Sequence, residues 1–181
     1  SGLLLLVSLP FAISILKPYQ KSRILTFFNP DRDPLGAGYQ IIQSKIAIGS
    51  GGFFGKGYLK GTQSYLEFLP EKHTDFIFTL FSEEFGFFGS VFILILYAII
   101  IWRIIKAGDI TRSNFGKLYC YSFATAFFIY VVVNMMMVLG LLPIVGSPLP
   151  IMSYGGSSMM AMMLGLGIVM SCKVYKDTPV N

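Results

Sequence analysis

Charged residues are scarce in this sequence: Asp, Glu, Lys and Arg together account for 13% of its 181 residues. A soluble domain of this length usually carries about twice that fraction. The shortage therefore argues against a water-soluble globular fold. Cysteine is also rare, with only Cys120 and Cys172, both inside apolar runs. Two thiols without metal-ligand spacing argue against a disulfide framework or a zinc site, so we interpret both as small buried apolar side chains.

Apolar residues make up 54% of the chain and come in long runs. A membrane-spanning helix needs about 20 such residues to cross a hydrocarbon core of about 30 Å, and three runs are that long. In lipid these runs must be helical, because the backbone has to satisfy its own hydrogen bonds. We therefore predict an all-α polytopic membrane protein. The expected membrane segments are a truncated helix at 1–17 and full spans at 85–106, 117–142 and 157–173.

Basic residues in the short connections predict the orientation. Cytoplasmic flanks attract Lys and Arg, so the turn at 107–116 and the tail at 174–181 are expected to be cytoplasmic. The segment 18–84 and the turn at 143–156 then lie outside. Segment 18–84 also carries many basic residues, but the rule weakens for loops of about 60 residues or more. The basic residues that set the orientation are Arg103, Lys106, Arg112, Lys117, Lys173 and Lys176.

The outer segment 18–84 has features of a large, partly helical loop. A turn cluster, NPDRDP at 29–34, is followed by Tyr39, Ile42 and Ile46 at helical spacing. This spacing predicts a short amphipathic helix that lies on the membrane surface. The glycine-rich stretch 49–52 is expected to end it.

A polar stripe is predicted where this outer segment enters the next span. Thr74 is a plausible N-cap, which would put Asp75 in the first helical turn, where the helix dipole favours an ionised carboxylate. A straight helix reaching back from Trp102 at the inner boundary places Asp75 roughly 10–12 Å above the outer end of the span, in the head-group layer. The stripe consists of Asp75, Thr79, Ser82 and Glu83, which share one helical face.

Two interpretations of this stripe remain open on the residues alone. A carboxylate at Asp75, beside Lys72 and His73, could act on the polar head of a lipid-linked substrate. Alternatively, these charges are simply solvated on an outer loop, because a carboxylate near a membrane indicates function only when it faces an interior or a cavity. The single histidine, His73, is more often a packing or hydrogen-bonding residue than a metal ligand.

A second unusual stretch lies at 140–158 and reads GLLPIVGSPLPIMSYGGSS, with three prolines and four glycines between apolar runs. Irregular backbone at membrane depth is tolerated only where protein or a water-filled cavity covers it. We therefore predict that the re-entrant turn at 143–156 packs in the bundle beside Asp75, with Ser153 and Tyr154 as candidate substrate-binding residues. The alternative is a proline-stiffened connector with no ligand role.

These stretches together resemble the SEDS family (shape, elongation, division and sporulation proteins). The resemblance rests on LPEKHTDFIF at 69–78 and on the GLLP, PLP and SYGGSS elements of 140–158. The preceding GTQS at 61–64 resembles the elongation branch of the family more than the division branch. The resemblance implies a fold of ten transmembrane helices, of which this chain would carry the four C-terminal ones, the seventh to the tenth, with the large extracytoplasmic loop between the first two of these.

The resemblance also implies a function. Family members are peptidoglycan glycosyltransferases of the bacterial cytoplasmic (inner) membrane, with an active site that faces outward. They polymerise lipid II into glycan strands for cell elongation and rod shape, and they release undecaprenyl pyrophosphate. Their partners are a class B penicillin-binding protein, which crosslinks the strands, and the elongation machinery. A divalent cation, Mg²⁺ or Mn²⁺, is commonly implied.

The resulting hypothesis assigns each candidate residue a role. The family's essential carboxylate maps onto Asp75, which we expect to act as general base, and Asp75 and Glu83 are candidate ligands of the cation. The rival functions are a lipid II flippase that performs no glycosyl transfer and a scaffold that only recruits the crosslinking enzyme. Nucleic acid is not expected as a partner, because a membrane explains the net charge of +5. The residues expected to bind substrate are Lys72, His73, Thr74, Glu83, Ser153 and Tyr154.

Overall fold

A computed structural model describes residues 18–28, 36–61 and 74–175 of the chain. These residues form helices and turns, with no strand among them, so the predicted all-α class is confirmed. The truncated helix expected at 1–17 and the tail expected at 174–181 fall wholly or mostly outside the described residues. The helices are α2 (Pro18–Phe28), α3 (Ala37–Gly51), α5 (Ile77–Ile110), α6 (Asn114–Val138) and α7 (Gly156–Val174).

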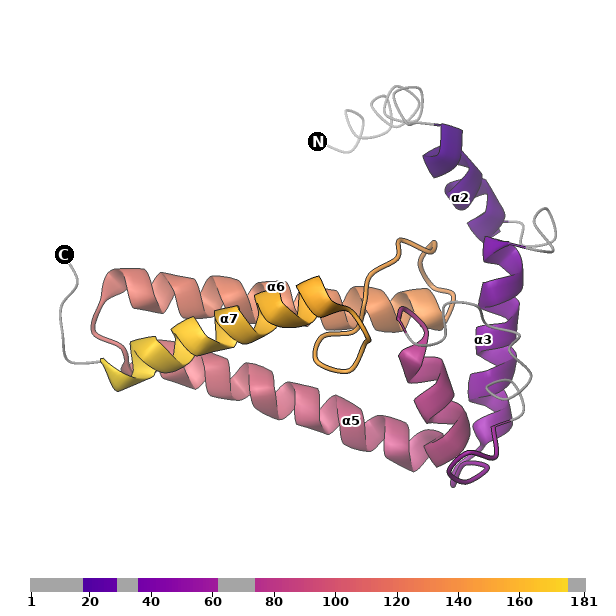
Figure 1. Ribbon diagram of the computed structural model, residues 1–181, viewed down its shortest axis with the longest axis horizontal. Coiled ribbons are helices and arrows are strands. Elements are labelled where there is room, and N and C mark those ends of the chain that lie inside the picture. The colour runs from indigo at the N-terminus through magenta and orange to yellow at the C-terminus, as the bar shows by residue number, and fades with distance from the viewer. Residues whose placement is uncertain (1–17, 29–35, 62–73, 176–181) are drawn as a thin grey trace, which may run out of the picture.

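Three of these helices, α5, α6 and α7, are long and apolar enough to cross a membrane. They run alongside one another as a bundle, whereas α2 and α3 follow each other across one end of it (Figure 1). The segment 139–155, which joins α6 to α7, lies at the same end as α3. At the opposite end only Thr111–Ser113 separate α5 from α6. The long outer segment and the glycine–proline stretch therefore meet on one side of the bundle.

The core of the bundle lies between α5 and α6. The rings of Tyr97 and Phe127 lie 6.0 Å apart between centroids, and both side chains are buried. Cys120 is fully buried and Cys172 is half-buried, and neither forms a disulfide. Many large apolar side chains on the outer faces of the helices are exposed, as expected of surfaces that lipid covers. Examples are Phe92, Ile95, Ile129, Met163 and Leu164.

Helix α3 packs through small residues. Ile41, Ser44 and Ala47 are buried, and the Ser44 hydroxyl donates to the carbonyl of Val138 at 2.8 Å, which joins α3 to the end of α6. Ile42 and Ile46 face outward and are exposed. The predicted helix is thus present, and the Ile42–Ile46 face is the one free to meet a membrane surface.

Helix α6 ends earlier than the span predicted to reach residue 142. Gly140 adopts a positive φ of 66°, which glycine tolerates because it has no Cβ. The amide of Gly140 donates to the carbonyl of Met137, and the amide of Leu141 donates to the carbonyl of Met136. This pair of bonds is a Schellman motif, which satisfies the last carbonyls of the helix and turns the chain away. The helix therefore stops at Val138.

The sequence led us to expect a straight helix at α5, but the helix is broken. Gly86 interrupts it with φ 67° and ψ −160°, a conformation that only glycine adopts readily. The short first part, residues 77–85, therefore points in a different direction from the long part that runs through the bundle (Figure 1). We call residues 74–85 the arm, because this part carries Thr74 and Asp75 back toward segment 139–155. The expected position of Asp75, 10–12 Å above the span on a continuous helix, is thus wrong.

The start of α5 also differs from the expectation. Thr74 is not the N-cap: residues 74–76 form a turn, the helix begins after Phe76, and no side chain caps it. The amides of Thr79 and Leu80 instead donate to the carbonyl of Phe76. Asp75 therefore lies in the turn that precedes the helix rather than in its first turn.

Candidate active site

The turn at Thr74–Asp75 is held by a buried carboxamide on α6. Asn134 is fully buried, and its Nδ2 donates to the backbone carbonyl of Asp75 at 2.9 Å and to that of Ser147 at 2.6 Å. One side chain therefore joins the arm, α6 and segment 139–155. A polar side chain inside a membrane-spanning helix is costly, so its presence here indicates a functional requirement.

A second connection runs through Ser153. Its hydroxyl accepts from the amide of Leu149 and donates to the carbonyl of Thr74, both at 2.6 Å. Tyr97 of α5 holds the same segment, because its hydroxyl donates to the carbonyl of Pro150 at 2.6 Å. The prediction that the glycine–proline stretch packs beside Asp75 is confirmed by these hydrogen bonds.

The carboxylate of Asp75 lies against the backbone of this segment. A Cβ placed on Gly146 would come within 3.4 Å of Asp75 Oδ2, and Gly146 has a positive φ of 75°. Glycine suits this conformation, and the carboxylate lies at van der Waals contact distance from where a Cβ would be. Asp75 itself is half-buried, so its carboxylate is neither fully solvated nor sealed in the core.

An open cavity of about 450 Å³ lies beside this turn. It is lined by Ile77 of the arm, by Met152, Ser153 and Tyr154, and by Met159 at the start of α7. Tyr154 is 82% exposed. Its aromatic ring is thus available to a ligand, whereas the Ser153 hydroxyl is already occupied by its bonds to Leu149 and Thr74.

Three buried oxygen atoms near the arm have no hydrogen-bond partner within the described part of the chain: Thr79 Oγ1, Asn134 Oδ1 and Ser147 Oγ. Buried polar atoms are normally satisfied, so each calls for an explanation. Asn134 and Ser147 are also the residues joined to each other at the Asp75 turn. Neutral oxygens next to a carboxylate are the donor type that Mg²⁺ and Mn²⁺ prefer.

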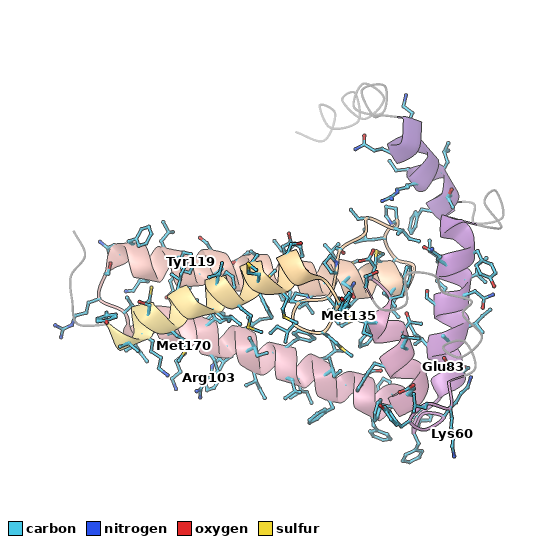
Figure 2. The ribbon with its side chains drawn as sticks, viewed as in Figure 1. Lys60, Glu83, Arg103, Tyr119, Met135 and Met170 are labelled. Atoms are coloured by element: carbon cyan, nitrogen blue, oxygen red, sulfur yellow. The ribbon has the colours of Figure 1, made fainter. Side chains whose placement is uncertain are left out.

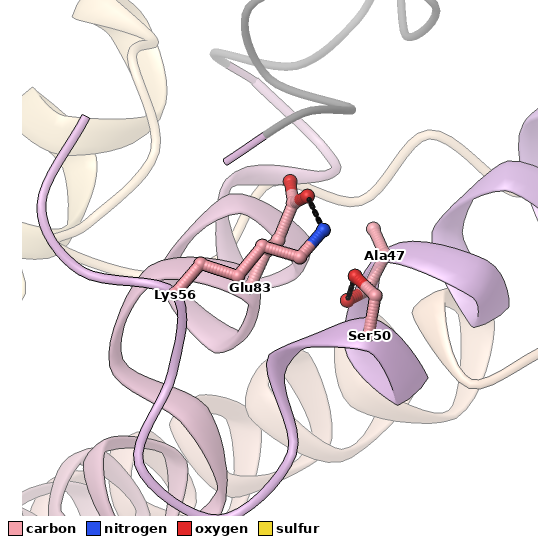
Figure 3. A network of polar contacts seen from close by, with 4 residues as sticks. All are labelled: Ala47, Ser50, Lys56 and Glu83. Carbon is pink, nitrogen blue, oxygen red and sulfur yellow. Dashed lines mark hydrogen bonds and ion pairs between the residues drawn. The ribbon is translucent and has the colours of Figure 1, made fainter. Parts of the chain in front are cut away.

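Glu83, which was predicted to bind substrate or a metal, lies apart from this group. Its side chain is 0% exposed, and its Oε1 lies 2.8 Å from Nζ of Lys56 (Figure 3). The helical rise from Ile77 to Glu83 is about 9 Å, and Asp75 lies in the turn beyond Ile77, so Glu83 is well separated from the Asp75 turn. Among residues 18–28, 36–61 and 74–175, no three His, Cys, Asp or Glu side chains converge.

The other expected site residues have mixed outcomes. Lys72 and His73 lie outside the described residues. Thr74 contributes its backbone carbonyl, and Tyr154 lines the cavity. Sequence reasoning missed Asn134 and Tyr97, although a lone carboxamide in the apolar run 117–142 is a signal that could have found the first.

Figure 2 shows at which end of the bundle its labelled residues lie. Glu83 and Lys60 lie at the end crossed by α3, and Met135 marks the neighbouring part of α6. Arg103, Tyr119 and Met170 lie toward the opposite end, where α5 and α6 connect. The candidate site is therefore confined to one end of the bundle.

Comparisons with known proteins show which family the chain resembles. The family model FtsW/RodA/SpoVE, described as "Cell cycle protein", matches residues 1–178. The chain is 50% identical over 162 residues to the peptidoglycan glycosyltransferase MrdB of Escherichia coli K12, which covers 90% of this chain and 44% of the relative. It is 46% identical over 159 residues to the peptidoglycan glycosyltransferase RodA of Treponema pallidum, covering 88% of this chain and 37% of the relative. The chain thus spans less than half the length of these relatives.

Two solved structures share the fold. One, from work on the structural coordination of polymerization and crosslinking by a peptidoglycan synthase complex, matches with a TM-score of 0.73 and 36% identity over 98% of this chain and 48% of the other. The other is a mutant of the Thermus thermophilus rod shape determining protein RodA, with a TM-score of 0.59 and 34% identity over 68% of this chain and 39% of the other.

Proposed function

Because the chain belongs to the FtsW/RodA/SpoVE family, we propose that the protein containing it is a peptidoglycan glycosyltransferase that polymerises lipid II. The observation that carries the proposal is the anchoring of Asp75. Asn134 and Ser153 each donate a part-buried hydrogen bond to the turn in which this half-buried carboxylate lies, and Asn134 also donates to Ser147. A carboxylate held in this way suits a reaction that needs a base in one position.

In the proposed reaction Asp75 is the general base. A hydroxyl oxygen of the acceptor sugar attacks the anomeric carbon of the lipid-linked donor, and its proton passes to the Asp75 carboxylate. The bond from the anomeric carbon to the pyrophosphate oxygen breaks, and undecaprenyl pyrophosphate leaves with the bonding electrons. A well-positioned base contributes about 10²–10⁴-fold to such a step.

The chain's own residues supply the setting for this step. The backbone bonds to Asn134 and Ser153 keep Asp75 in one position, so its carboxylate need not be ordered during the reaction. The cavity lined by Tyr154 and Met152 lies next to it and has room for a sugar or a lipid head group. Lys72 and His73 remain candidates for contacts with the pyrophosphate and with Asp75.

A divalent cation fits this site by its donor chemistry. Among the described residues, Asp75 is the carboxylate that would hold it, together with neutral oxygens such as Asn134 Oδ1 and Ser147 Oγ. Mg²⁺ commonly binds through one or two carboxylates plus substrate phosphates, so no larger protein cage is required. When bound, the cation would supply positive charge against the pyrophosphate that leaves.

The cellular setting follows from the same reasoning. The short basic connections support an orientation with the arm and segment 139–155 on the outer side, in the bacterial cytoplasmic (inner) membrane that the family membership implies. A class B penicillin-binding protein is the expected partner, as part of the elongation machinery. The structural match to a chain of a peptidoglycan synthase complex supports a partner that crosslinks the strands.

The test replaces Asp75 by Asn in the full-length protein and measures polymerisation of lipid II in detergent. Loss of at least about 10²-fold in turnover is expected, because Asn keeps the shape but cannot take the proton. The matched control is Asp109→Asn at the opposite end of α5, which should polymerise as the parent does. Retained turnover in Asp75→Asn would remove the base assignment.

The same assay separates the proposal from a lipid II flippase. Detergent leaves no membrane to cross, so a flippase makes no glycan product, whereas a polymerase does. Purified parent protein that binds lipid II without making product would favour a flippase or a scaffold.

A further inference from the structure

The loop that follows α3 forms hydrogen bonds with the backbone of α5 on both sides of the break at Gly86. A helix end leaves carbonyls and amides without partners inside the helix. Here the loop at 52–57 satisfies both kinds of group. Its amides donate to the helix carbonyls before the break, and its carbonyls accept from the helix amides after it. The four bonds are Lys56 N to Glu83 O at 3.0 Å, Gly57 N to Glu84 O at 3.0 Å, Phe87 N to Gly52 O at 2.9 Å and Phe88 N to Phe53 O at 3.2 Å.

An ion pair reinforces the same contact. Lys56 Nζ and Glu83 Oε1 lie 2.8 Å apart, with the Glu83 side chain fully buried and that of Lys56 26% exposed (Figure 3). A buried carboxylate is strongly unfavourable unless a cation or donors compensate it. The pair therefore joins the end of the arm nearest Gly86 to the loop.

Two glycines allow the backbones to approach closely at this contact. A Cβ on Gly51 would come within 2.3 Å of the Ser82 carbonyl, and one on Gly55 would come within 2.1 Å of the Glu84 carbonyl. Backbone of α3 and of the loop thus touches backbone of the arm directly. We call the four bonds, the ion pair and these close approaches the clamp.

The geometry gives the clamp leverage over Asp75. Eleven residues separate Asp75 from Gly86, which is about 16 Å at helical rise. A tilt of the arm by only about 5° at the break would therefore move Asp75 by more than about 1 Å. A misplacement of about 1 Å caused far from the reacting atoms can reduce a rate by about 10²-fold.

We propose that Lys56 and Glu83 are positioning residues for glycosyl transfer, which hold the arm at the angle that presents Asp75 to the substrate. The inference rests on the proposed function, and it assigns Glu83 no contact with substrate or metal. Asn134 fixes the end of the arm that carries Asp75, and the clamp fixes the end next to Gly86. Both attachments are needed, because a rigid element fixed at one end can still pivot.

The first test measures kcat and KM for lipid II in the full-length protein with Glu83→Gln and, separately, Lys56→Met. Each is expected to reduce kcat by about 10–100-fold with KM within about threefold, since only the catalytic geometry changes. The neighbouring change Lys60→Met is the matched control and should leave both constants unchanged. A rise in KM with unchanged kcat would make Glu83 a substrate contact and overturn the proposal.

Rescue and coupling distinguish positioning from general damage. Lys56→Arg keeps the charge and should retain at least about a third of the parent kcat. The double variant Glu83→Gln with Lys56→Met should be no worse than either single one, because the two act through one pair. If the kcat losses of the two single variants multiply in the double variant, Lys56 and Glu83 do not act as one pair.

Hydrogen exchange supplies a readout that needs no turnover. The amides of Lys56, Gly57, Phe87 and Phe88 should exchange at least about tenfold faster in Glu83→Gln than in the parent. Parent-like exchange together with parent-like kcat in Glu83→Gln would overturn the proposal. If Glu83→Gln does not fold, the same result in Lys56→Met would overturn it. If instead the parent protein makes no glycan product while exchange rises as expected, the proposed function fails and the clamp itself stands; retained turnover in Asp75→Asn removes only the base assignment.

Discussion

Replacement of Gly86 by alanine tests the break in α5 directly. The Cβ of alanine would come within 2.3 Å of the Gly55 amide nitrogen and 2.8 Å of the Phe53 carbonyl oxygen. Both are backbone atoms, which cannot rotate out of the way as a side chain can. The φ of 67° and ψ of −160° at this position are in addition unfavourable for any residue with a Cβ.

The size of the effect follows from the two responses open to the chain. If the break is kept, backbone strain of about 1–3 kcal/mol adds to overpacking of about 1–3 kcal/mol. If α5 straightens instead, the four hydrogen bonds of the clamp are lost at about 0.5–1.5 kcal/mol each. Both routes cost about 2–6 kcal/mol, and the second also swings Asp75 away from segment 139–155.

The assay is the Tm of the full-length protein in detergent, measured beside polymerisation of lipid II. Gly86→Ala should lower the Tm by several degrees and reduce turnover at least about tenfold. Gly49→Ala, within helix α3, is the control, because no atom lies within 4 Å of a Cβ placed there. Alanine at this position should stabilise the helix by about 0.5–1 kcal/mol. Parent-like Tm and turnover in Gly86→Ala would refute the reasoning about the break.

The remaining predictions concern the anchor and the cation. Asn134→Ala strands two backbone carbonyls, at about 1–3 kcal/mol each, and should lower both the Tm and turnover. Asn134→Asp has the same size but lacks the donor, so it should be at least as damaging; a parent-like Asp variant would show that packing alone matters. Chelation of divalent cations should reduce turnover, and added Mg²⁺ or Mn²⁺ should restore it. Mn²⁺ affinity, measured by electron paramagnetic resonance, should fall much more in Asp75→Asn, which removes a ligand, than in Glu83→Gln, which only shifts the arm; equal losses would contradict the separation of the two carboxylates.

The membrane class and the site region could be predicted from the sequence because they depend on local patterns. Long apolar runs need helices to satisfy their backbone in lipid, whatever surrounds them. The proline–glycine stretch at 140–158 signalled irregular backbone, and the hydrogen bonds of Ser153 and Asn134 place it beside Thr74 and Asp75. The composition of one segment was sufficient for that prediction.

The role of Glu83 could not be predicted in this way. Its spacing from Asp75 and Thr79 is the same on a helix that carries a catalytic stripe and on one that packs against a loop. Only the approach of Lys56, 27 residues earlier in the chain, decides that the carboxylate is buried and paired. Asn134 was missed for a similar reason, because its two acceptors lie on distant segments.

The sequence by itself determined that this chain forms apolar helices with one polar region where the long outer segment meets the glycine–proline stretch. Those features depend on hydropathy and backbone chemistry, which act over a few residues. Tertiary structure alone decided the direction of the arm. A glycine permits a break without requiring it, and at Gly86 the loop at 52–57 supplies the hydrogen bonds that make the broken helix the stable one.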